Sequence, residues 1–436
     1  MPDRRAPVAI VGGGFSGTMV AAHLARRGIR SVLIEANGKA GQGTAFSTSD
    51  PAHLLNIRAD NMGAWANAPE DFAARENVAE SSYAERRQFG RYLRAILDEA
   101  VASGNVEVVE DRAAGARRNS GGWIIDVARG QAIEADALVL ALGNQPPGKL
   151  PLLEAAGDRV VDDPWGDRAR AAIADTVARQ DDVLIVGTSL TMIDVALSLH
   201  FAGHRGRILA LSRRGKIPLG QEMERAPAFE PKELPHPKIR SIARWLRSNA
   251  KKVGWRAAVD SLRPHSHHLW QALPLSEKRL FLRFGRPWWD IHRHRIAPAV
   301  ATKVEELLES GQLEVAAGQL VDVRDVGNCV DIRYRRRGHV EVEPARRFGY
   351  IFNCTGPLGD ISRTRDPLLR QLLDSGDAKP DELFIGLAVD AQSRVSERLW
   401  ALGTLTKGRY WEMIAVPDIR DQAAAVAEDI AMELGQ

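Results

Sequence analysis

The chain has 436 residues, of which 44% are hydrophobic and 26% are charged, so it can bury more than one sizeable core. Lysine and arginine number 59 against 56 aspartate and glutamate residues, a balance that argues against a nucleic-acid-binding protein. No apolar run approaches the roughly 20 residues of a membrane span, and MPDRRAPVAIVGGG lacks a signal-peptide core. Cys329 and Cys354 form no CxxC motif, which excludes a dithiol redox centre. We expect a reduced, cytoplasmic protein with no membrane partner.

A glycine-rich turn follows the first apolar run of the chain. Val8 to Val11 suit a short parallel strand that is buried on both faces. Gly12, Gly14 and Gly17 follow with GxGxxG spacing. In such a turn the first glycine permits the tight bend, the second lets the backbone approach a pyrophosphate, and the third lets helix and strand pack closely.

The helix after this turn should point its first N–H groups at the phosphates of a ligand. It is expected to begin with Phe15 and Ser16 and to end near Arg27, before Gly28. A second strand at 31–34 ends in Glu35, at about the 20-residue distance where a carboxylate binds ribose hydroxyls. Strand, turn, helix and acid together predict a dinucleotide site.

Three later segments combine an apolar strand with a small-residue end. They are ALGN at 141–144 with Gly143, FNCTG at 352–356 with Gly356, and LWALG at 399–403. Such ends recur where the chain passes close to a cofactor. Their order predicts an α/β fold of two Rossmann-like units with parallel sheets, the second inserted in the first. We expect the first domain at 1–165 and 340–436, and the second at 180–340 with a helical insertion at about 238–310.

A second strand–turn–helix pattern starts at residue 182. The strand 182–186 leads to Gly187 and a helix that opens with Leu190. Ser189 and Met192 occupy the positions of the second and third glycines. Either this is a second dinucleotide site or it is a plain βαβ unit without a ligand.

The strand that follows favours the second dinucleotide site. Residues 207–211 are apolar in their interior and lead to Arg213 and Arg214, at the place that Glu35 occupies in the first unit. An acid there would repel a 2′-phosphate, whereas arginines accommodate one. We therefore predict NADPH at the second site; the alternative is a solvated strand end.

The middle of the chain offers polar and aromatic candidates. Residues 51–65 read as a loop near the cofactor, with the polar side chains of Asn56, Arg58 and Asn61. The helical segment contains five tryptophans, expected in the core or a pocket wall, and histidines at 265, 267, 268, 292 and 294. Since HExxH, a cysteine partner and a clear carboxylate set are missing, we expect no metal site.

These residues resemble a family of bacterial FAD/NAD(P)-binding proteins, the FAD-dependent urate hydroxylase-like proteins, which are related to the two-dinucleotide flavoprotein monooxygenases. The resemblance covers almost the whole chain. It rests on GGGFSG (12–17), GTAFSTSDPAHLLNIRADNM (43–62), RRQFGRYL (86–93), VGTSLTMIDVALSL (186–199), SRRG (212–215), WRAAVDSLRP (255–264), RPWWDIHRHRIAP (286–298), NCTGPLGD (353–360) and WEMIAVPDIRDQA (411–423).

The resemblance implies FAD in the first site and a nicotinamide nucleotide near the second. It implies that Gly12, Gly14, Gly17 and Glu35 hold the FAD adenosine and pyrophosphate. It also implies that three residues of the HLLN loop lie near the flavin and that the start of the last helix faces its ring. These residues are His53, Leu55 and Asn56 in the loop, and Val416, Pro417 and Asp418 in the helix.

Two features depart from related patterns. The FxGxxxHxxxW signature of Baeyer–Villiger monooxygenases is absent, so that subclass is not expected. Ser189 in place of glycine leaves open that a partner flavin reductase, rather than bound NADPH, supplies the electrons.

The expected activity is that of an NADPH-dependent monooxygenase. NADPH would reduce FAD, and molecular oxygen would then form a flavin hydroperoxide that hydroxylates a small substrate, a nitrogen-rich heterocycle or an amine. Proton donors near the flavin would tune this species. The candidates are His53, Asp290, His292 and His294.

Three alternatives to a monooxygenase remain open. One is a reductase or dehydrogenase that passes electrons on without oxygenation. Another is a non-catalytic flavin-binding accessory or sensor protein, and the third is an electron supplier for a separate oxygenase. Tight coupling of NADPH oxidation to hydroxylation would distinguish the monooxygenase from the first of these.

Overall fold

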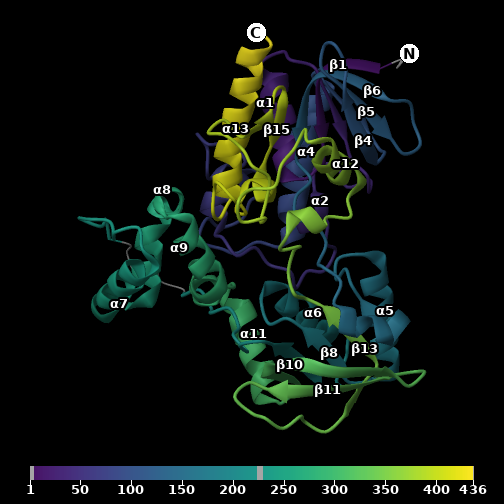
Figure 1. The fold of residues 1–436 in the computed structure, drawn as a ribbon, viewed down its shortest axis with the longest axis vertical. Coiled ribbons are helices and arrows are strands. Elements are labelled where there is room, and N and C mark those ends of the chain that lie inside the picture. Colours follow the sequence, from purple (N-terminus) through teal and green to yellow (C-terminus); the bar gives the residue numbers. More distant parts are fainter. Residues whose placement is uncertain (1–3, 223–228, 436) are drawn as a thin grey trace.

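The chain folds into two α/β units, one above the other in Figure 1, with a group of helices at their side. The computed structural model describes residues 4–222 and 229–435. Each unit has its own sheet, and both chain ends lie in the upper unit, so the lower unit is an insertion in the upper one (Figure 1). The predicted fold class, two Rossmann-like units with parallel sheets, is confirmed.

The first sheet has its parallel strands in the order β15-β6-β1-β2-β3. Antiparallel strands complete it, with β14 at the edge beside β15, and the β4-β5 hairpin beside β6. Its strands are β1 Arg4–Val11, β2 Ser31–Ile34, β3 Val106–Val109, β4 Ala113–Arg118, β5 Trp123–Val127, β6 Ile133–Leu140, β14 Arg394–Ser396 and β15 Leu399–Ala401. Because strand residues alternate between faces, Val8 and Ile10 enter one core, and Ala9 and Val11 the other.

Helices from both ends of the chain cover the first sheet. α1 (Phe15–Arg26) packs against α4 (Arg86–Ala102) and α13 (Val416–Glu433) on one face. α12 (Pro367–Ser375) packs on β4 at the other face. Short helical turns connect these elements: α2 Gly43–Phe46, η1 Ala59–Asn61, α3 Asp71–Arg75, η5 Ile361–Arg363 and η6 Gly403–Thr406.

The second sheet has the strand order β12-β11-β10-β9-β8-β13-β7. It is parallel from β10 to β7 and continues through the antiparallel β10-β11-β12 edge. Its strands are β7 Val160–Val161, β8 Val183–Val186, β9 Ile208–Ser212, β10 Leu313–Asp325, β11 Val330–Arg336, β12 Arg346–Phe348 and β13 Tyr350–Asn353. The helices α5 (Asp167–Arg179), α6 (Leu190–Phe201) and α11 (Pro298–Glu309) cover one face, and η2 (Pro151–Arg159) covers the other.

The strand pairing corrects the expected boundaries at 165 and 340. β7 lies before residue 165, and β12 and β13 lie after residue 340, yet all three belong to the second sheet. The FNCTG segment therefore completes the second unit, although we assigned it to the first. Parallel strands pair with partners that are distant in the sequence, and a short apolar strand does not reveal which sheet it joins.

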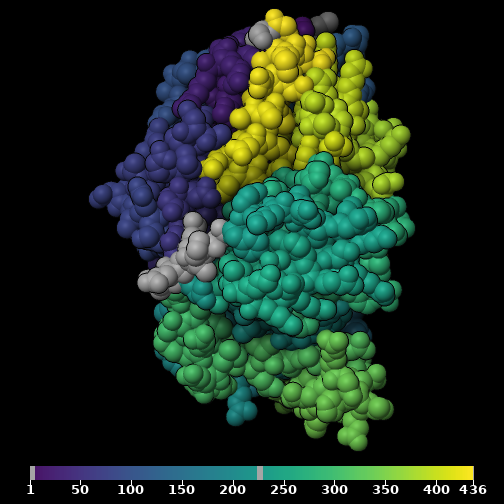
Figure 2. Space-filling view, turned by 90° about the vertical axis from the view of Figure 1, so that its left-hand side faces the viewer, coloured from purple at the N-terminus to yellow at the C-terminus, as the bar shows by residue number. Residues whose placement is uncertain are grey.

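The segment 239–293 is helical, as predicted, and lies across the junction of the two units in Figure 2. Its helices are α7 Ile239–Leu262, η3 Arg263–His265, α8 Ser266–Ala272, α9 Leu275–Leu280, η4 Phe281–Gly285 and α10 Arg286–Arg293. The ring of Trp270 stacks on that of Trp411, with the ring centroids 4.9 Å apart. This contact fixes the segment to the C-terminal part of the chain. α7 is broken at Gly254, where φ is +81° and ψ is 159°.

None of the helices in the described ranges combines the length and the hydropathy that a bilayer span requires.

Candidate functional site

The first glycine turn has the tight geometry that its sequence predicts. Gly12 has a φ of +106°, and an added Cβ would overlap the carbonyl oxygen of Ala141 at the end of β6. A Cβ at Gly17 would overlap the carbonyl oxygen of Gly12, so α1 packs directly on the turn. The ALGN segment therefore lies against this turn, and Gly143 follows with a φ of +63°.

Gly14 leaves room beside the start of α1. Its φ of −76° suits any residue, and among the described residues an added Cβ would meet only the Cα of Gly43, at an ordinary 3.6 Å. α1 begins after Gly14, with Phe15 and Ser16 in its first turn, and no side chain of the described chain caps it. Room and uncapped N–H groups fit the pyrophosphate that FAD would bring.

Glu35 closes the same turn from the end of β2. Its carboxylate is buried; Oε2 accepts the Gly13 N–H at 2.7 Å and Oε1 accepts the Asn37 N–H at 3.0 Å. Each carboxylate oxygen has a further lone pair, so ribose hydroxyls can still donate to it. The chemistry of this acid fits the adenosine ribose.

The C-terminal part of the chain also contacts the start of α1, through Gly403 and the first turn of α13. An added Cβ at Gly403 would lie 3.1 Å from the Ser16 hydroxyl and 3.8 Å from Ile419, in the first turn of α13. The buried Val416 and Pro417 open α13. The start of α13 therefore lies beside the start of α1, as expected if it faces the cofactor.

His53 lies between the two units rather than in an open site. Its Nδ1 is 2.8 Å from the Thr48 hydroxyl, and its Nε2 is 3.0 Å from the Ser198 hydroxyl on α6. Leu55 is buried in the first core, and the carbonyl of Asn56 accepts a hydrogen bond from Gln221 at 3.4 Å. Both ring nitrogens of His53 are occupied, which favours a role in joining the units over the predicted role as proton donor.

The second turn repeats the geometry of the first. Gly187 has a φ of +119°, and an added Cβ would overlap the carbonyl oxygen of Cys354 at the end of β13. Gly356 follows with a φ of +89°, just as Gly143 follows Ala141. The NCTG segment thus serves the second turn as ALGN serves the first.

In the second unit, Ser189 and Met192 occupy the positions of the second and third glycines, before and within the helix α6. Ser189 is the N-cap of α6, which begins at Leu190, and no described side chain caps this end. Met192 is fully buried and fills the core where the third glycine would otherwise stand. The Thr188 hydroxyl, which sequence reasoning missed, donates to the carbonyl of Lys216 at 2.6 Å and lies 2.9 Å from the Ser212 hydroxyl. The only sequence feature that could have indicated Thr188 is a polar residue within a glycine turn.

The two arginines after β9 have different surroundings. The Arg214 guanidinium donates to the carbonyls of Phe284 at 3.1 Å and Arg283 at 2.9 Å, so it holds the helical segment. Arg213 is exposed at the strand end. Burial, followed by the charges of Arg214 and Arg337, lowers the pKa of Lys216, so cations gather here. The predicted 2′-phosphate role stays with Arg213, whereas Arg214 has a structural contact that the sequence did not indicate.

Asp290 and His292 lie on α10, and His294 follows directly after it. Asp290 Oδ1 is 3.6 Å from His294 Nδ1, and its Oδ2 accepts from Arg286 Nε at 3.3 Å. Burial lowers the pKa of both histidines. No cluster of three or more potential metal ligands occurs in the described parts of the chain.

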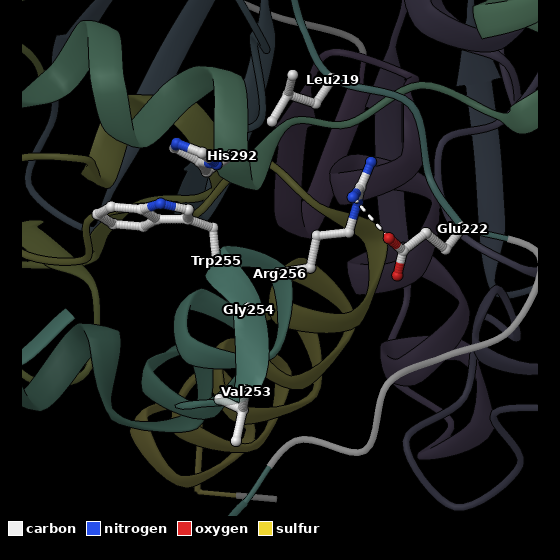
Figure 3. Close-up of a pocket in the computed structure, with 7 residues that line it drawn as sticks. All are labelled: Leu219, Glu222, Val253, Gly254, Trp255, Arg256 and His292. Atoms are coloured by element: carbon white, nitrogen blue, oxygen red, sulfur yellow. Dashed lines mark hydrogen bonds and ion pairs between the residues drawn. The ribbon is translucent and has the colours of Figure 1, made fainter. Parts of the chain in front are cut away.

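His292 also lines a cavity of about 260 Å³ beside the break in α7 (Figure 3). The sequence did not reveal this cavity, because its wall combines three separate segments. Its lining residues are Leu219, Glu222, Val253, Gly254, Trp255, Arg256 and His292.

Comparison with known protein families gives one match, in the first unit. Residues 9–145 match the family model described as FAD-NAD(P)-binding, the region with the first glycine turn, Glu35 and the ALGN segment. No curated protein matches the chain.

Solved structures share the fold over nearly the full length. L-lysine 6-monooxygenase from Pseudomonas syringae is 13% identical with a TM-score of 0.69, covering 98% of this chain and 100% of its own. An ornithine N-hydroxylase from Kutzneria sp. 744 is 14% identical with a TM-score of 0.65, covering 98% and 99%. The bacillithiol disulfide reductase from Staphylococcus aureus is 15% identical with a TM-score of 0.58, covering 98% and 99%. Residues 9–145 therefore resemble an FAD-NAD(P)-binding family, and the chain shares its overall fold with these three enzymes.

Proposed function

We propose that the chain is an FAD-dependent oxidoreductase, and more specifically an NADPH-dependent monooxygenase that hydroxylates a small nitrogen-containing substrate. The observation that carries this proposal is the repetition of one turn geometry at the ends of two parallel sheets. Gly12 lies against Ala141 in the first unit, and Gly187 lies against Cys354 in the second. Two such turns in one chain are expected when a nicotinamide nucleotide delivers a hydride to a flavin.

The structural likenesses support the choice of cofactors and of substrate class. The Kutzneria enzyme was solved with reduced FAD, NADP⁺ and L-ornithine. The Kutzneria and Pseudomonas syringae enzymes are named for the hydroxylation or monooxygenation of amino acids that bear a side-chain amine. We take from them FAD, NADPH, molecular oxygen and an amine-like substrate.

The residues of the chain would bind, orient and shield these reactants. Gly14, Glu35 and the start of α1 would hold the FAD pyrophosphate and ribose. Bound FAD would accept the hydride and activate oxygen. The N-terminus of α13 at Val416 would stabilise negative charge on the reduced ring. The start of α6 and Arg213 would hold NADPH.

The overall reaction balances with one nicotinamide per turnover. A substrate R–H reacts with O₂, NADPH and H⁺ to give R–OH, NADP⁺ and water. NADPH supplies two electrons, one oxygen atom enters the substrate, and the other leaves as water.

The test is the coupling of NADPH oxidation to hydroxylated product in air, with hydrogen peroxide measured in parallel. We expect a substrate that raises NADPH oxidation and yields about one product per NADPH. If substrates raise NADPH oxidation but the electrons appear only in peroxide or another acceptor, the monooxygenase assignment is refuted.

The likeness to a disulfide reductase makes an NADPH-dependent reductase the second candidate. Such an enzyme would consume NADPH without oxygen when given its acceptor. Both cysteines are free thiols, and burial raises the pKa of the Cys354 thiol. Because the thiolate is the reactive form, the buried Cys354 thiol with its raised pKa argues against a dithiol relay within the chain.

A further inference from the structure

A buried ion pair joins the two α/β units. Arg86, the first residue of α4 in the first unit, has its Nη2 3.1 Å from Oδ1 and 3.0 Å from Oδ2 of Asp194, which lies on α6 in the second unit. The two side chains are only 14% and 10% exposed. Separating a buried pair leaves an uncompensated charge away from water, which is strongly unfavourable. The pair therefore fixes the place where α6 meets the first unit.

The same arginine holds the loop that the sequence resemblance places beside the flavin. The backbone N–H of Arg86 donates to the carbonyl of His53 at 2.8 Å, and its Nε donates to the carbonyl of Leu54 at 3.2 Å. The Leu54 side chain packs against the core of the second unit. One residue thus connects the HLLN loop to α6.

On the second unit, the partner of Arg86 lies one turn into the helix that follows the second glycine turn. α6 begins at Leu190, and at a rise of about 1.5 Å per residue Asp194 lies about 6 Å along the helix from this end. The start of α6 is where we propose that NADPH binds. Because both belong to one continuous helix, the ion pair also fixes the position of the proposed nucleotide site.

A second polar contact, one turn further along α6, fixes the direction of the helix. Ser198 Oγ lies 3.0 Å from His53 Nε2 and donates to Asp50 Oδ2 at 2.6 Å, and both partners belong to the first unit. The ring centre of Trp165 is 5.7 Å from the Arg86 guanidinium carbon and 5.8 Å from the centre of the His53 ring. Hydrogen bonds depend on distance and angle, whereas the hydrophobic effect has no direction. Polar contacts on successive turns therefore hold α6 in one orientation.

We propose that Arg86 and Asp194 are positioning residues, which hold the second unit where NADPH can reduce the flavin. The inference rests on the proposed function and concerns its reductive half. One hydride leaves NADPH, which becomes NADP⁺, and the flavin gains that hydrogen with both electrons. Reacting atoms have to lie about 3–3.5 Å apart, and a displacement of about 1 Å can cost about 100-fold in rate. Neither side chain has to touch a reactant, since each acts through the loop or the helix that it holds.

The first test is anaerobic stopped-flow reduction of the FAD-loaded protein over a range of NADPH concentrations, which separates the limiting rate from the Kd of NADPH. Asp194→Asn should lower the limiting rate about 10- to 100-fold. The Kd should change less than about twofold, because the start of α6 and Arg213 are unaltered. A role in stability alone would not produce this split between rate and affinity.

Two further variants separate positioning from stability. Arg86→Met/Asp194→Leu replaces the ion pair by apolar side chains, which commonly preserves stability. It should still slow the reduction, because an apolar contact sets no direction. Asp429→Asn is the matched control: Asp429 is 7% exposed, as Asp194 is, and accepts from Arg394 Nε at 2.6 Å within the first unit. It should lower the midpoint of urea unfolding and leave the limiting rate unchanged.

The second test is small-angle X-ray scattering of the purified protein without NADPH, which reports the orientation of the units directly. The wild type and Asp429→Asn should fit the arrangement of the two units in Figure 1. Asp194→Asn and the double variant should depart from it. If Asp194→Asn does not fold, the double variant decides both tests.

The outcomes separate this inference from the proposed function. Wild-type scattering in both variants overturns the inference, whatever the flavin does. A wild-type limiting rate in both variants, or a raised Kd without a lower rate, also overturns it. A lower limiting rate with changed scattering and an unchanged Kd supports it. If NADPH does not reduce the wild type, the proposed function fails, and the scattering alone decides whether the ion pair fixes the two units.

Discussion

Replacing Gly14 by alanine should weaken FAD binding while leaving the fold of the apoprotein intact. The φ of Gly14 is −76°, and among the described residues an added Cβ would meet only Gly43, at 3.6 Å, so no protein atom has to move. Since alanine is a poor N-cap, we expect a loss of stability below about 1 kcal/mol.

The cost to FAD binding follows from the same geometry. A phosphate oxygen that accepts an N–H bond at about 2.9 Å from the backbone leaves no space for a methyl group at Gly14. Displacing the phosphate by one methyl radius should break at least one charge-assisted hydrogen bond, worth about 1.5–3 kcal/mol. The Kd of FAD should therefore rise about 10- to 150-fold.

The assay is FAD titration of the refolded apoprotein by flavin fluorescence, with urea unfolding of the apoprotein alongside. Gly28→Ala is the matched control: Gly28 has a φ of +75°, and an added Cβ would meet no atom of the described chain within 4 Å. It should cost about 1 kcal/mol of stability without changing the Kd. Wild-type FAD affinity in Gly14→Ala would refute the placement of the pyrophosphate at this turn.

Three further predictions concern charges elsewhere in the chain. Arg213→Ala should raise the KM for NADPH about tenfold and leave that for NADH unchanged, because only NADPH has a 2′-phosphate; equal changes in both would contradict the assignment. The buried Glu412 carboxylate accepts a hydrogen bond from Trp289 Nε1 at 2.6 Å and forms an ion pair with Arg293 Nε at 3.3 Å. Glu412→Gln should therefore lower the free energy of unfolding in urea by about 1–3 kcal/mol. Burial, followed by the charges of neighbouring arginines, lowers the pKa of His23 to about 4, so between about pH 6.5 and pH 4 the unfolded chain binds a proton that the folded chain does not. Stability should therefore fall by about 3 kcal/mol as the pH drops through this window, and His23→Gln should remove that part of the urea-unfolding profile; an unchanged profile would contradict the shift.

Local features of the fold could be predicted from the sequence because they depend on neighbouring residues. The turn at Gly12, the helix that begins at Phe15, and the strand that ends in Glu35 follow from glycine spacing and apolar runs, and the structure contains them. The same reasoning predicted the second turn at Gly187, despite Ser189 and Met192. At the position of the third glycine, Met192 is fully buried in the core of the second unit.

Contacts between distant segments could not be predicted. β7 and β13 join the second sheet by pairing Val160 with Ile351, 191 residues later in the chain, which no local pattern encodes. The two ring nitrogens of His53 are occupied by a hydroxyl of its own loop and one on α6, and Arg214 is bound to carbonyls of the helical segment. Glu222 and Arg256, which are 34 residues apart in the sequence, form an ion pair beside the break of α7 at Gly254.

The most direct test of the central claim, two functional dinucleotide sites in one chain, is anaerobic stopped-flow reduction of the FAD-loaded protein. The absorbance of the bound flavin is followed after mixing with NADPH or with NADH. Two sites with Arg213 beside the second predict rapid bleaching by NADPH and slow bleaching by NADH. No bleaching with either nucleotide would contradict the account, because the turn at Gly187 would then hold no nucleotide and a partner flavin reductase would have to supply the electrons.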